Sequence, residues 1–137
     1  MDLKSGFLNI PVSPECKQYL GLITAEGLYQ WDRMPFGLMG APMHFQYVID
    51  TELGKMPPSV KRVAYLDDVT TYGDDWPEVW EDTLAVLRQL TGAGFMINLK
   101  KCKFLSAKVT VLGCTFQDTG YILGDKTIKK WVEQRLP

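Results

Sequence analysis

The sequence predicts an α+β fold in which a mostly antiparallel sheet packs on two helices. Residues 41–55 and 76–92 have apolar residues at helical spacing, and short strand-like stretches bounded by turn residues surround both. Segregated hairpins with packing helices are typical of α+β domains. The chain has 137 residues, of which 46% are hydrophobic, so it is long enough for one packed domain.

The predicted order of elements is β-β-β-α-β-β-α-β-β-β-α. Asp2 is expected at the end of the first strand, and residues 19–31 predict two short strands around Ala25-Glu26-Gly27. Residues 61–73 predict a further strand pair with two acids at its centre. The elements expected after residue 94 are three strands and a terminal helix, which lie at 95–98, near 108–116, at 120–123 and at 126–135.

Each predicted helix has a start signal and an apolar stripe. Pro42 suits the first turn of the 41–55 helix, Asp75 can cap the 76–92 helix, and Gly92 can end it. The stripe of the first helix consists of Phe45, Val48, Ile49 and Leu53. The stripe of the second helix consists of Trp76, Val79, Trp80, Leu84, Leu87 and Leu90.

Charge and cysteine content indicate the kind of partner and the compartment of this protein. The net charge is −1, but residues 65–90 hold seven acids and one base, whereas residues 98–137 hold eight bases and three acids. This asymmetry fits an acidic region that binds a metal ion and a basic region that binds a polyanion. It equally fits two solvated surfaces. Three cysteines without close spacing, no signal peptide and no membrane-length apolar run indicate an intracellular protein, cytoplasmic or nuclear, without a membrane partner.

Two adjacent acids, Asp67 and Asp68, stand in the middle of the strand-like stretch VKRVAYLDDVTTYG. An ordinary Asp-rich β-turn explains them, and the residues alone favour that interpretation. The alternative is a cation site, because Mg²⁺ binds one or two carboxylates and keeps room for substrate phosphates. If Asp2 lies beside this hairpin, three carboxylates would suffice for two Mg²⁺ ions about 3.5–4 Å apart.

Five blocks in this order carry a resemblance to a known family. They are DLKSGF (2–7), RMPFGLMGAPMHFQ (33–46), YLDD (65–68), GFMINLKKCKF (94–104) and VLGC (111–114). Together they resemble the palm motifs of reverse transcriptases, most closely those in polyproteins of gypsy-type LTR retrotransposons. The resemblance implies a palm domain with a ferredoxin-like core over residues 1–124, followed by the start of a thumb-like helix at 125–137. The implied activity is RNA-directed DNA polymerisation.

The resemblance also implies a catalytic metal centre. Asp2 and Asp67 match the principal ligands of two Mg²⁺ ions, with Mn²⁺ as a possible substitute, and Asp68 matches a supporting ligand. The backbone carbonyl of Leu3 is expected as a further ligand. Lys101 matches a lysine that assists the leaving pyrophosphate, although a solvated basic loop is the plainer interpretation of this lysine.

Nucleotide and nucleic-acid contacts follow from the same blocks. Phe7 resembles the steric gate that excludes a 2′-hydroxyl, and the segment Pro35-Phe36-Gly37 resembles the part that touches the nucleotide, as does Tyr65. Gln46 is expected to face the template. Leu112, Gly113 and Cys114 resemble the primer grip. Without the motifs, Phe7 would be read as a core residue.

The implied partners are an RNA or DNA template and primer, a deoxynucleoside triphosphate, and the fingers, thumb and RNase H regions of a polyprotein. In the family the fingers precede the first motif, so a palm fragment without fingers is expected, and on its own it is expected to be inactive. The alternative function is a catalytically inactive relic or co-opted palm that binds nucleic acid weakly. A phosphoacceptor receiver domain also clusters aspartates, but it needs regular βαβ alternation, which this order lacks.

Overall fold

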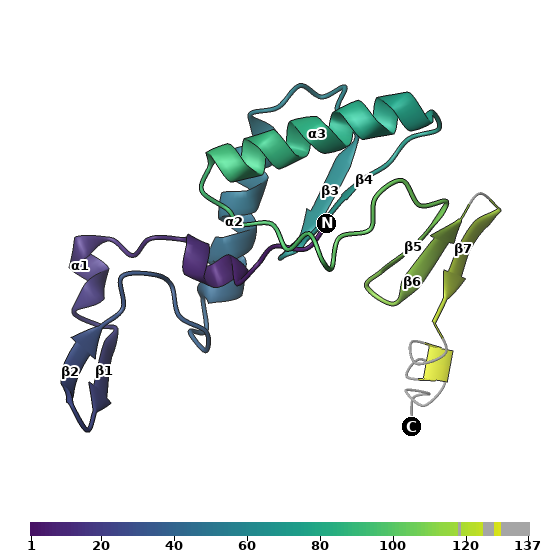
Figure 1. The fold of residues 1–137 in the computed structure, drawn as a ribbon. Coiled ribbons are helices and arrows are strands. Elements are labelled where there is room, and N and C mark those ends of the chain that lie inside the picture. Colours follow the sequence, from purple (N-terminus) through teal and green to yellow (C-terminus); the bar gives the residue numbers. More distant parts are fainter. Residues whose placement is uncertain (118, 125–127, 130–137) are drawn as a thin grey trace. The chain divides into compact units, whose positions relative to one another are not determined.

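The computed structural model describes residues 1–117, 119–124 and 128–129. The chain forms two compact units, Met1–Cys102 and Lys103–Pro137, which are described separately here (Figure 1). Every strand pair in the described residues is antiparallel. The predicted α+β class is therefore confirmed, whereas the palm boundary at residue 124 stays a prediction because compactness alone does not define a family domain.

The first unit contains eight elements in the described chain. They are η1 (Gly6–Asn9), α1 (Pro14–Lys17), β1 (Gly21–Thr24), β2 (Gly27–Gln30), α2 (Ala41–Gly54), β3 (Arg62–Tyr65), β4 (Asp68–Thr71) and α3 (Trp76–Gly92). The predicted helices at 41–55 and 76–92 and the predicted strand pairs at 19–31 and 61–73 are confirmed. The short α1 was not predicted.

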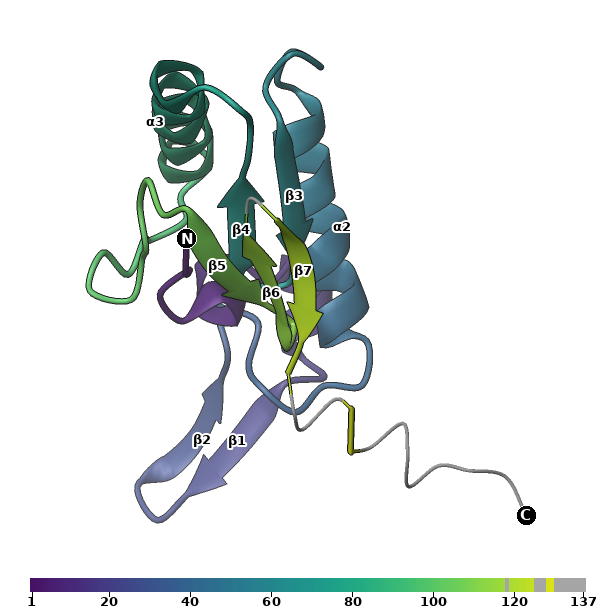
Figure 2. The ribbon, with the colours of Figure 1, turned by 90° about the vertical axis from the view of Figure 1, so that its right-hand side faces the viewer.

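The core of this unit lies between α2, α3 and the β3–β4 hairpin. Figure 2 shows α2 along β3 and α3 beside β4. The five large side chains that are fully buried come from these three elements, and they are Phe45, Ile49, Val69, Val86 and Leu90. Their removal from water is the main term that holds the helices against the hairpin.

The apolar stripe predicted for α3 is confirmed in part, because Leu90 is buried and Val79, Leu84 and Leu87 are half-buried. The buried residues of this helix are Asp82, Thr83, Val86 and Leu90, whereas Trp76 and Trp80 are exposed. The packed face is polar where it meets the strands: Thr83 shares a 2.7 Å hydrogen bond with Thr71, and Asp82 accepts one of 2.9 Å from the Lys61 amide. Hydrophobicity alone therefore missed two buried polar residues of this face, because satisfied polar groups can be buried too.

Residues 95–98 form a single bridge rather than the predicted strand. Leu3 pairs with Ile97, and two backbone hydrogen bonds flank this pair, from Lys4 to Met96 at 2.8 Å and from Asn98 to the Asp2 carbonyl at 2.9 Å. The segment is too short to extend the ladder further. It nevertheless holds residues 2–4 on the side opposite the β3–β4 hairpin.

The β1–β2 hairpin is exposed along both strands. At its base, Lys17 forms an ion pair with Asp32, and this ammonium lowers the pKa of the Asp32 carboxyl. Arg33 connects the segment after β2 to the end of η1 by donating a 2.9 Å hydrogen bond to the carbonyl of Asn9. No helix in the described part of the chain has the length and apolar character that a membrane crossing requires.

The second unit is a three-stranded meander of β5 (Lys108–Val111), β6 (Cys114–Gln117) and β7 (Gly120–Leu123). The stretch near 108–116 was predicted as one strand, which is wrong, since the chain reverses at Leu112-Gly113 and forms two. The strand at 120–123 is confirmed. The helix predicted at 126–135 lies outside the described residues, apart from Ile128 and Lys129.

Gly6 gives the first testable consequence of this packing. A Cβ added to Gly6 would lie 2.7 Å from the Phe45 ring, which is completely buried and cannot move away. We expect Gly6→Ala to lower the free energy of unfolding by about 1–3 kcal/mol in urea denaturation, as overpacking does. Gly54→Ala is the matched control, because a Cβ there meets nothing within 4 Å and should be neutral or stabilising. Equal stability of Gly6→Ala and wild type would contradict the close ring contact.

Candidate active site

Asp2 and Asp68 lie directly opposite each other in an antiparallel bridge. Two backbone hydrogen bonds flank the pair, from Leu3 to the Asp67 carbonyl at 3.1 Å and from Val69 to the Met1 carbonyl at 3.0 Å. This pattern identifies the narrow kind of antiparallel pair, in which the two Cα atoms are about 4.5 Å apart. Side chains of such a pair stand on the same face, so the two carboxylates, 66 residues apart in sequence, share one side of the sheet.

Asp67 lies in the two-residue turn that joins β3 to β4. The register pairs Tyr65 with Asp68, which leaves Leu66 and Asp67 as the turn. Leu66 has a φ of 51°, in the left-handed region that residues with a Cβ rarely adopt. An ideal Cβ on Gly6 would lie 3.7 Å from the Cβ of Asp67, so the start of η1 borders the same turn.

Asp2, Asp67 and Asp68 are together called the acidic corner below. Its ligand chemistry fits a divalent cation bound together with substrate phosphates. Mg²⁺ is commonly held by one or two carboxylates and completes its shell with water and phosphate oxygens. Asp2 and Asp68 supply two carboxylates on one face, and Leu3, which follows Asp2, is buried within the same backbone ladder. Within the described residues, no three His, Cys, Asp or Glu side chains gather closely enough to hold a metal ion. Convergence of all three predicted aspartates therefore remains a prediction.

Two neighbours from the segment after residue 98 reach Asp2. The Lys101 ammonium lies 3.9 Å from the Asp2 carboxylate, and Lys101 is 68% exposed, so the cation is free to turn toward a ligand. Cys102 accepts a 3.3 Å hydrogen bond from the Asp2 amide through its sulfur. The structure thus brings Lys101 to the predicted catalytic corner, and it adds Cys102 as a backbone support that the sequence did not reveal.

An aromatic cluster borders the acidic corner. The ring of Phe7 lies between those of Phe36 and Phe45, with centroid separations of 5.3 Å and 4.9 Å. Phe36 is 65% exposed whereas Phe45 is fully buried, so Phe7 connects the core to the surface. Two of the predicted nucleotide-binding residues, Phe7 and Phe36, are therefore in contact, and a ring packed on both sides has little freedom to move.

The other predicted nucleotide residues lie on both sides of this cluster. Pro35 is buried, and Gly37 has a φ of 91°, a left-handed conformation that glycine adopts without steric cost. Tyr65 ends β3, faces Asp68 across the hairpin and is 53% exposed. The Pro35-Phe36-Gly37 segment thus displays one ring on a firmly anchored, sharply turned backbone.

Gln46 does not extend freely toward solvent. Its side chain makes hydrogen bonds to the β3–β4 hairpin and to Asp50, and it is half-buried. The template contact predicted for Gln46 is not tested by these contacts. They do show that Gln46 bonds to the backbone of the β3–β4 hairpin, which the sequence did not indicate.

The predicted primer-grip residues belong to the second unit and form the β5–β6 turn. Leu112 and Gly113 are its two central residues, with φ values of 51° and 79°, and Cys114 begins β6. The Gly113 carbonyl accepts a 2.8 Å hydrogen bond from the Gly124 amide, which ties the turn to the end of β7. Leu112 is 59% exposed at the tip.

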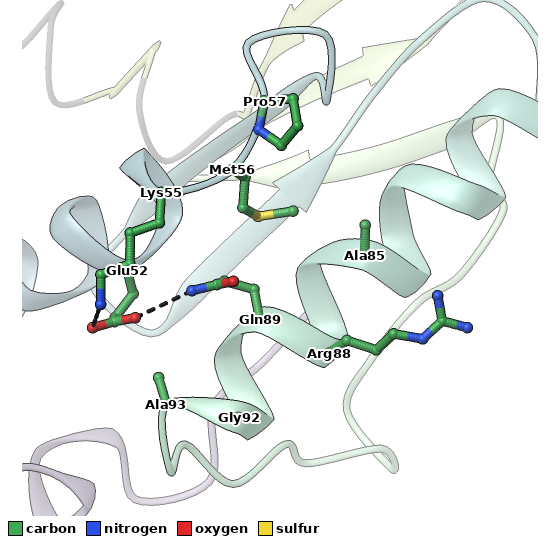
Figure 3. A pocket seen from close by; sticks show the side chains of 9 residues that line it. All are labelled: Glu52, Lys55, Met56, Pro57, Ala85, Arg88, Gln89, Gly92 and Ala93. Atoms are coloured by element: carbon green, nitrogen blue, oxygen red, sulfur yellow. Dashed lines mark hydrogen bonds and ion pairs between the residues drawn. The ribbon is translucent and has the colours of Figure 1, made fainter.

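A hollow of about 600 Å³ lies elsewhere, between the end of α2 and the last turns of α3. Figure 3 shows Glu52 on one side of this hollow, accepting hydrogen bonds from Lys55, just after α2, and from Gln89 of α3. None of the predicted site residues lines this hollow. The acidic corner, which is an open surface, is thus the better candidate for chemistry.

An antiparallel hairpin with acids at its tip, a third acid paired beside it and an aromatic cluster at its border are arranged as the motifs predicted for a palm domain. Residues 1–116 match the family described as reverse transcriptase (RNA-dependent DNA polymerase). The chain belongs to the reverse transcriptase family.

Relatives with curated descriptions are retrotransposon polyproteins. The chain is 31% identical over all 137 residues to the transposon Tf2-3 polyprotein of Schizosaccharomyces pombe, and it covers 10% of that protein. It is 32% identical over the same 137 residues to the retrovirus-related Pol polyprotein from transposon opus of Drosophila melanogaster, of which it covers 14%. The chain therefore spans a small part of the relatives that it matches.

Solved structures agree with this assignment. A foamy viral protease-reverse transcriptase in complex with dsDNA matches all of this chain and 28% of its own, with a TM-score of 0.79 and 25% identity. The foamy viral enzyme in complex with an RNA/DNA hybrid matches 99% of this chain and 18% of its own, with a TM-score of 0.80 and 25% identity. The palm fold that the motifs predicted is confirmed.

The β5–β6 turn yields a prediction about stability. Leu112 holds a left-handed φ that costs a residue with a branched side chain about 1 kcal/mol, whereas Asn-Gly is the favoured pair for such a turn. Leu112→Asn should therefore stabilise the β5–β6 pairing by about 1 kcal/mol, measured by hydrogen exchange of its amides. Leu112→Ala, which keeps the steric cost, should give no gain, and equal protection in both variants would contradict a strained turn.

Proposed function

We propose that this chain is the palm of an RNA-directed DNA polymerase that adds a deoxynucleotide to a primer 3′-hydroxyl by two-metal nucleotidyl transfer. Asp2, Asp67 and Asp68 would hold the cations, with the Leu3 carbonyl as a further ligand. Membership of the reverse transcriptase family supports the reaction class. The gypsy-type origin that the motifs predict is compatible with the retrotransposon relatives.

A single observation carries this proposal: the narrow antiparallel pair of Asp2 and Asp68 at the hairpin tip. An ordinary Asp-rich turn requires no third carboxylate from a segment 66 residues away. Two carboxylates on one face repel each other, and a cation between them would offset that repulsion, which supports a cation site here. This pair supports the cation site over the ordinary turn that the residues alone favoured.

In this proposal the chain's own groups bind and orient the reactants. When bound, the two Mg²⁺ ions would activate the attacking hydroxyl and stabilise the charge on the leaving pyrophosphate. Asp2 and Asp68 would present oxygens from one rigid pair of strands, so that little reorganisation is needed. The Lys101 ammonium, 3.9 Å from Asp2 and largely exposed, would neutralise or protonate a departing phosphate oxygen.

Selection of the sugar is assigned to the aromatic cluster. Phe7, packed between Phe36 and Phe45, would form a fixed wall under the sugar of the incoming nucleotide and exclude a 2′-hydroxyl by overlap. The Phe7 ring can exclude a 2′-hydroxyl only if it does not move aside, and the buried ring of Phe45 behind it prevents such movement. Pro35 and Gly37 would set the backbone that displays Phe36 to the nucleotide, and Tyr65 would contact it from β3.

Nucleic-acid partners are proposed on the same basis. Solved relatives hold dsDNA and an RNA/DNA hybrid, which supports a template and primer as the partners of this chain. The exposed Leu112-Gly113-Cys114 turn would contact the primer, and Gln46 would lie near the template. Polyprotein relatives support fingers, thumb and RNase H regions as further partners.

The cation site can be tested with Mn²⁺ alone. In a titration followed by two-dimensional NMR, paramagnetic Mn²⁺ should first broaden the amide signals of residues 2–3 and 67–68. Asp67→Asn should weaken Mn²⁺ binding at least tenfold, because one ligand charge is removed. The matched control is Asp74→Asn, an exposed acid in the loop after β4, which should leave the affinity unchanged.

Two results would contradict the cation site. One is broadening that spreads evenly over the acids of residues 65–90, which would indicate diffuse attraction to a negative surface. The other is equal loss of affinity in the Asp67 and Asp74 variants. A focused effect that disappears only with Asp67→Asn would establish the site without any need for polymerase activity.

A second test concerns the 137 residues on their own. They cover 18–28% of the two solved foamy viral chains described earlier, so most of each of those chains is outside the match. We expect little or no extension of a DNA primer on an RNA template by this chain alone. Deoxynucleotide incorporation that Asp67→Asn abolishes would refute this expectation and would demonstrate the enzyme directly.

A further inference from the structure

The tip of the β3–β4 hairpin needs support that its own strands do not supply. Leu66 occupies the left-handed region with a φ of 51°, a conformation that costs free energy for a residue with a Cβ. Asp67 and Asp68 follow immediately, so any relaxation at Leu66 moves both carboxylates. On one side the turn is held by the Leu3 amide, which donates a 3.1 Å hydrogen bond to the Asp67 carbonyl.

Gln46 of α2 holds the other side of the same turn. Its Oε1 atom accepts a 2.7 Å hydrogen bond from the Leu66 amide, and its Nε2 atom donates one of 3.2 Å to the Ala64 carbonyl. A single side chain thus bridges the last residues of β3 and the first residue of the turn. These contacts are partly buried, where a hydrogen bond is less weakened by competing water.

Asp50 fixes the orientation of this amide. Its Oδ1 atom accepts a 2.9 Å hydrogen bond from Gln46 Nε2, and the two residues are one helical turn apart on α2. A carboxylate can only accept, so the NH₂ end of Gln46 must face Asp50 and the carbonyl end must face Leu66. The amide is therefore held in the one orientation that can accept the Leu66 hydrogen.

We propose that Gln46, oriented by Asp50, is a positioning residue that fixes the metal-binding aspartates through the backbone of Leu66. This inference rests on the proposed cation site. It assigns Gln46 a task that differs from the predicted template contact, since both ends of its amide are turned toward the protein. The residue acts through the hairpin backbone and touches neither the reacting atoms nor the cation.

The proposal separates positioning from simple stability. If Gln46 only strengthens the fold, its loss lowers the melting temperature and leaves the folded molecule's affinity for Mn²⁺ unchanged. If it positions the aspartates, the folded variant binds Mn²⁺ more weakly, because part of the binding free energy goes into ordering the turn. Affinity measured well below the melting temperature distinguishes the two.

The first comparison is Gln46→Met against Gln89→Met, both in the 137-residue chain. Gln89 is the matched control, since its amide also joins a helix to a neighbour, donating a 3.2 Å hydrogen bond to Glu52. We expect Gln46→Met to speed exchange of the Leu66 amide and to weaken Mn²⁺ binding, each by about threefold to tenfold, as loss of one such hydrogen bond implies. Gln89→Met should change neither.

A second pair of variants does not depend on removing the side chain. Gln46→Glu keeps the acceptor for Leu66 but places a carboxylate against Asp50 and the Ala64 carbonyl, so Mn²⁺ binding should weaken. Adding Asp50→Asn supplies an NH₂ group for the new carboxylate and should restore much of the affinity. Recovery in the double variant shows that the orientation of residue 46 controls the site.

Different results would overturn the positioning role of Gln46 and the cation site itself. Wild-type Mn²⁺ affinity in both Gln46→Met and Gln46→Glu would overturn the positioning role and leave the cation site standing. Absence of focused Mn²⁺ binding in the wild type would overturn both. If Gln46→Met does not fold, the Gln46→Glu pair decides, and failure of Asp50→Asn to restore binding then counts against the proposal.

Discussion

The narrow antiparallel bridge between the first residues and the β3–β4 turn is the constraint on which the site depends. Its hydrogen bonds, from Leu3 to Asp67 and from Val69 to Met1, are backbone contacts, so they fix position regardless of the side chains they align. The bridge between Leu3 and Ile97 secures the opposite edge. Residues 1–4 are thus clamped between two segments, and a carboxylate at position 2 becomes part of a sheet rather than of a loose end.

The core explains why this bridge can form where it does. Phe45 lies beneath Gly6, and the lack of a Cβ there lets the ring approach η1 while the start of η1 approaches Asp67. The same ring supports Phe7, which supports Phe36. Packing in the interior and geometry at the surface therefore depend on the same contacts, so a change in side-chain volume at Phe45 would also displace Phe7 and Phe36.

The sequence predicted the parts of this fold that local pattern controls. Period and capping identified α2 and α3, and alternation with Asp67-Asp68 at its centre identified the β3–β4 hairpin. It placed the buried face of α3 only in part, because Asp82 and Thr83 are buried through hydrogen bonds that hydrophobicity does not detect. The bridge to Asp2 came from the family motifs rather than from spacing, since pairing across more than 60 residues leaves no local signal.

The contacts of Gln46 and Cys102 lay beyond sequence reasoning for a related reason. Each bonds to a backbone group of a distant segment, the Leu66 amide in one case and the Asp2 amide in the other. A motif records that a residue type recurs in a block, but it does not say whether the side chain faces a ligand or the protein. One contact is to the amide of Asp2 itself, and the other is to the amide of the residue before Asp67. Because these supports act on the backbone, they do not occupy the carboxylate oxygens, as the proposed cation site on a strained turn would require.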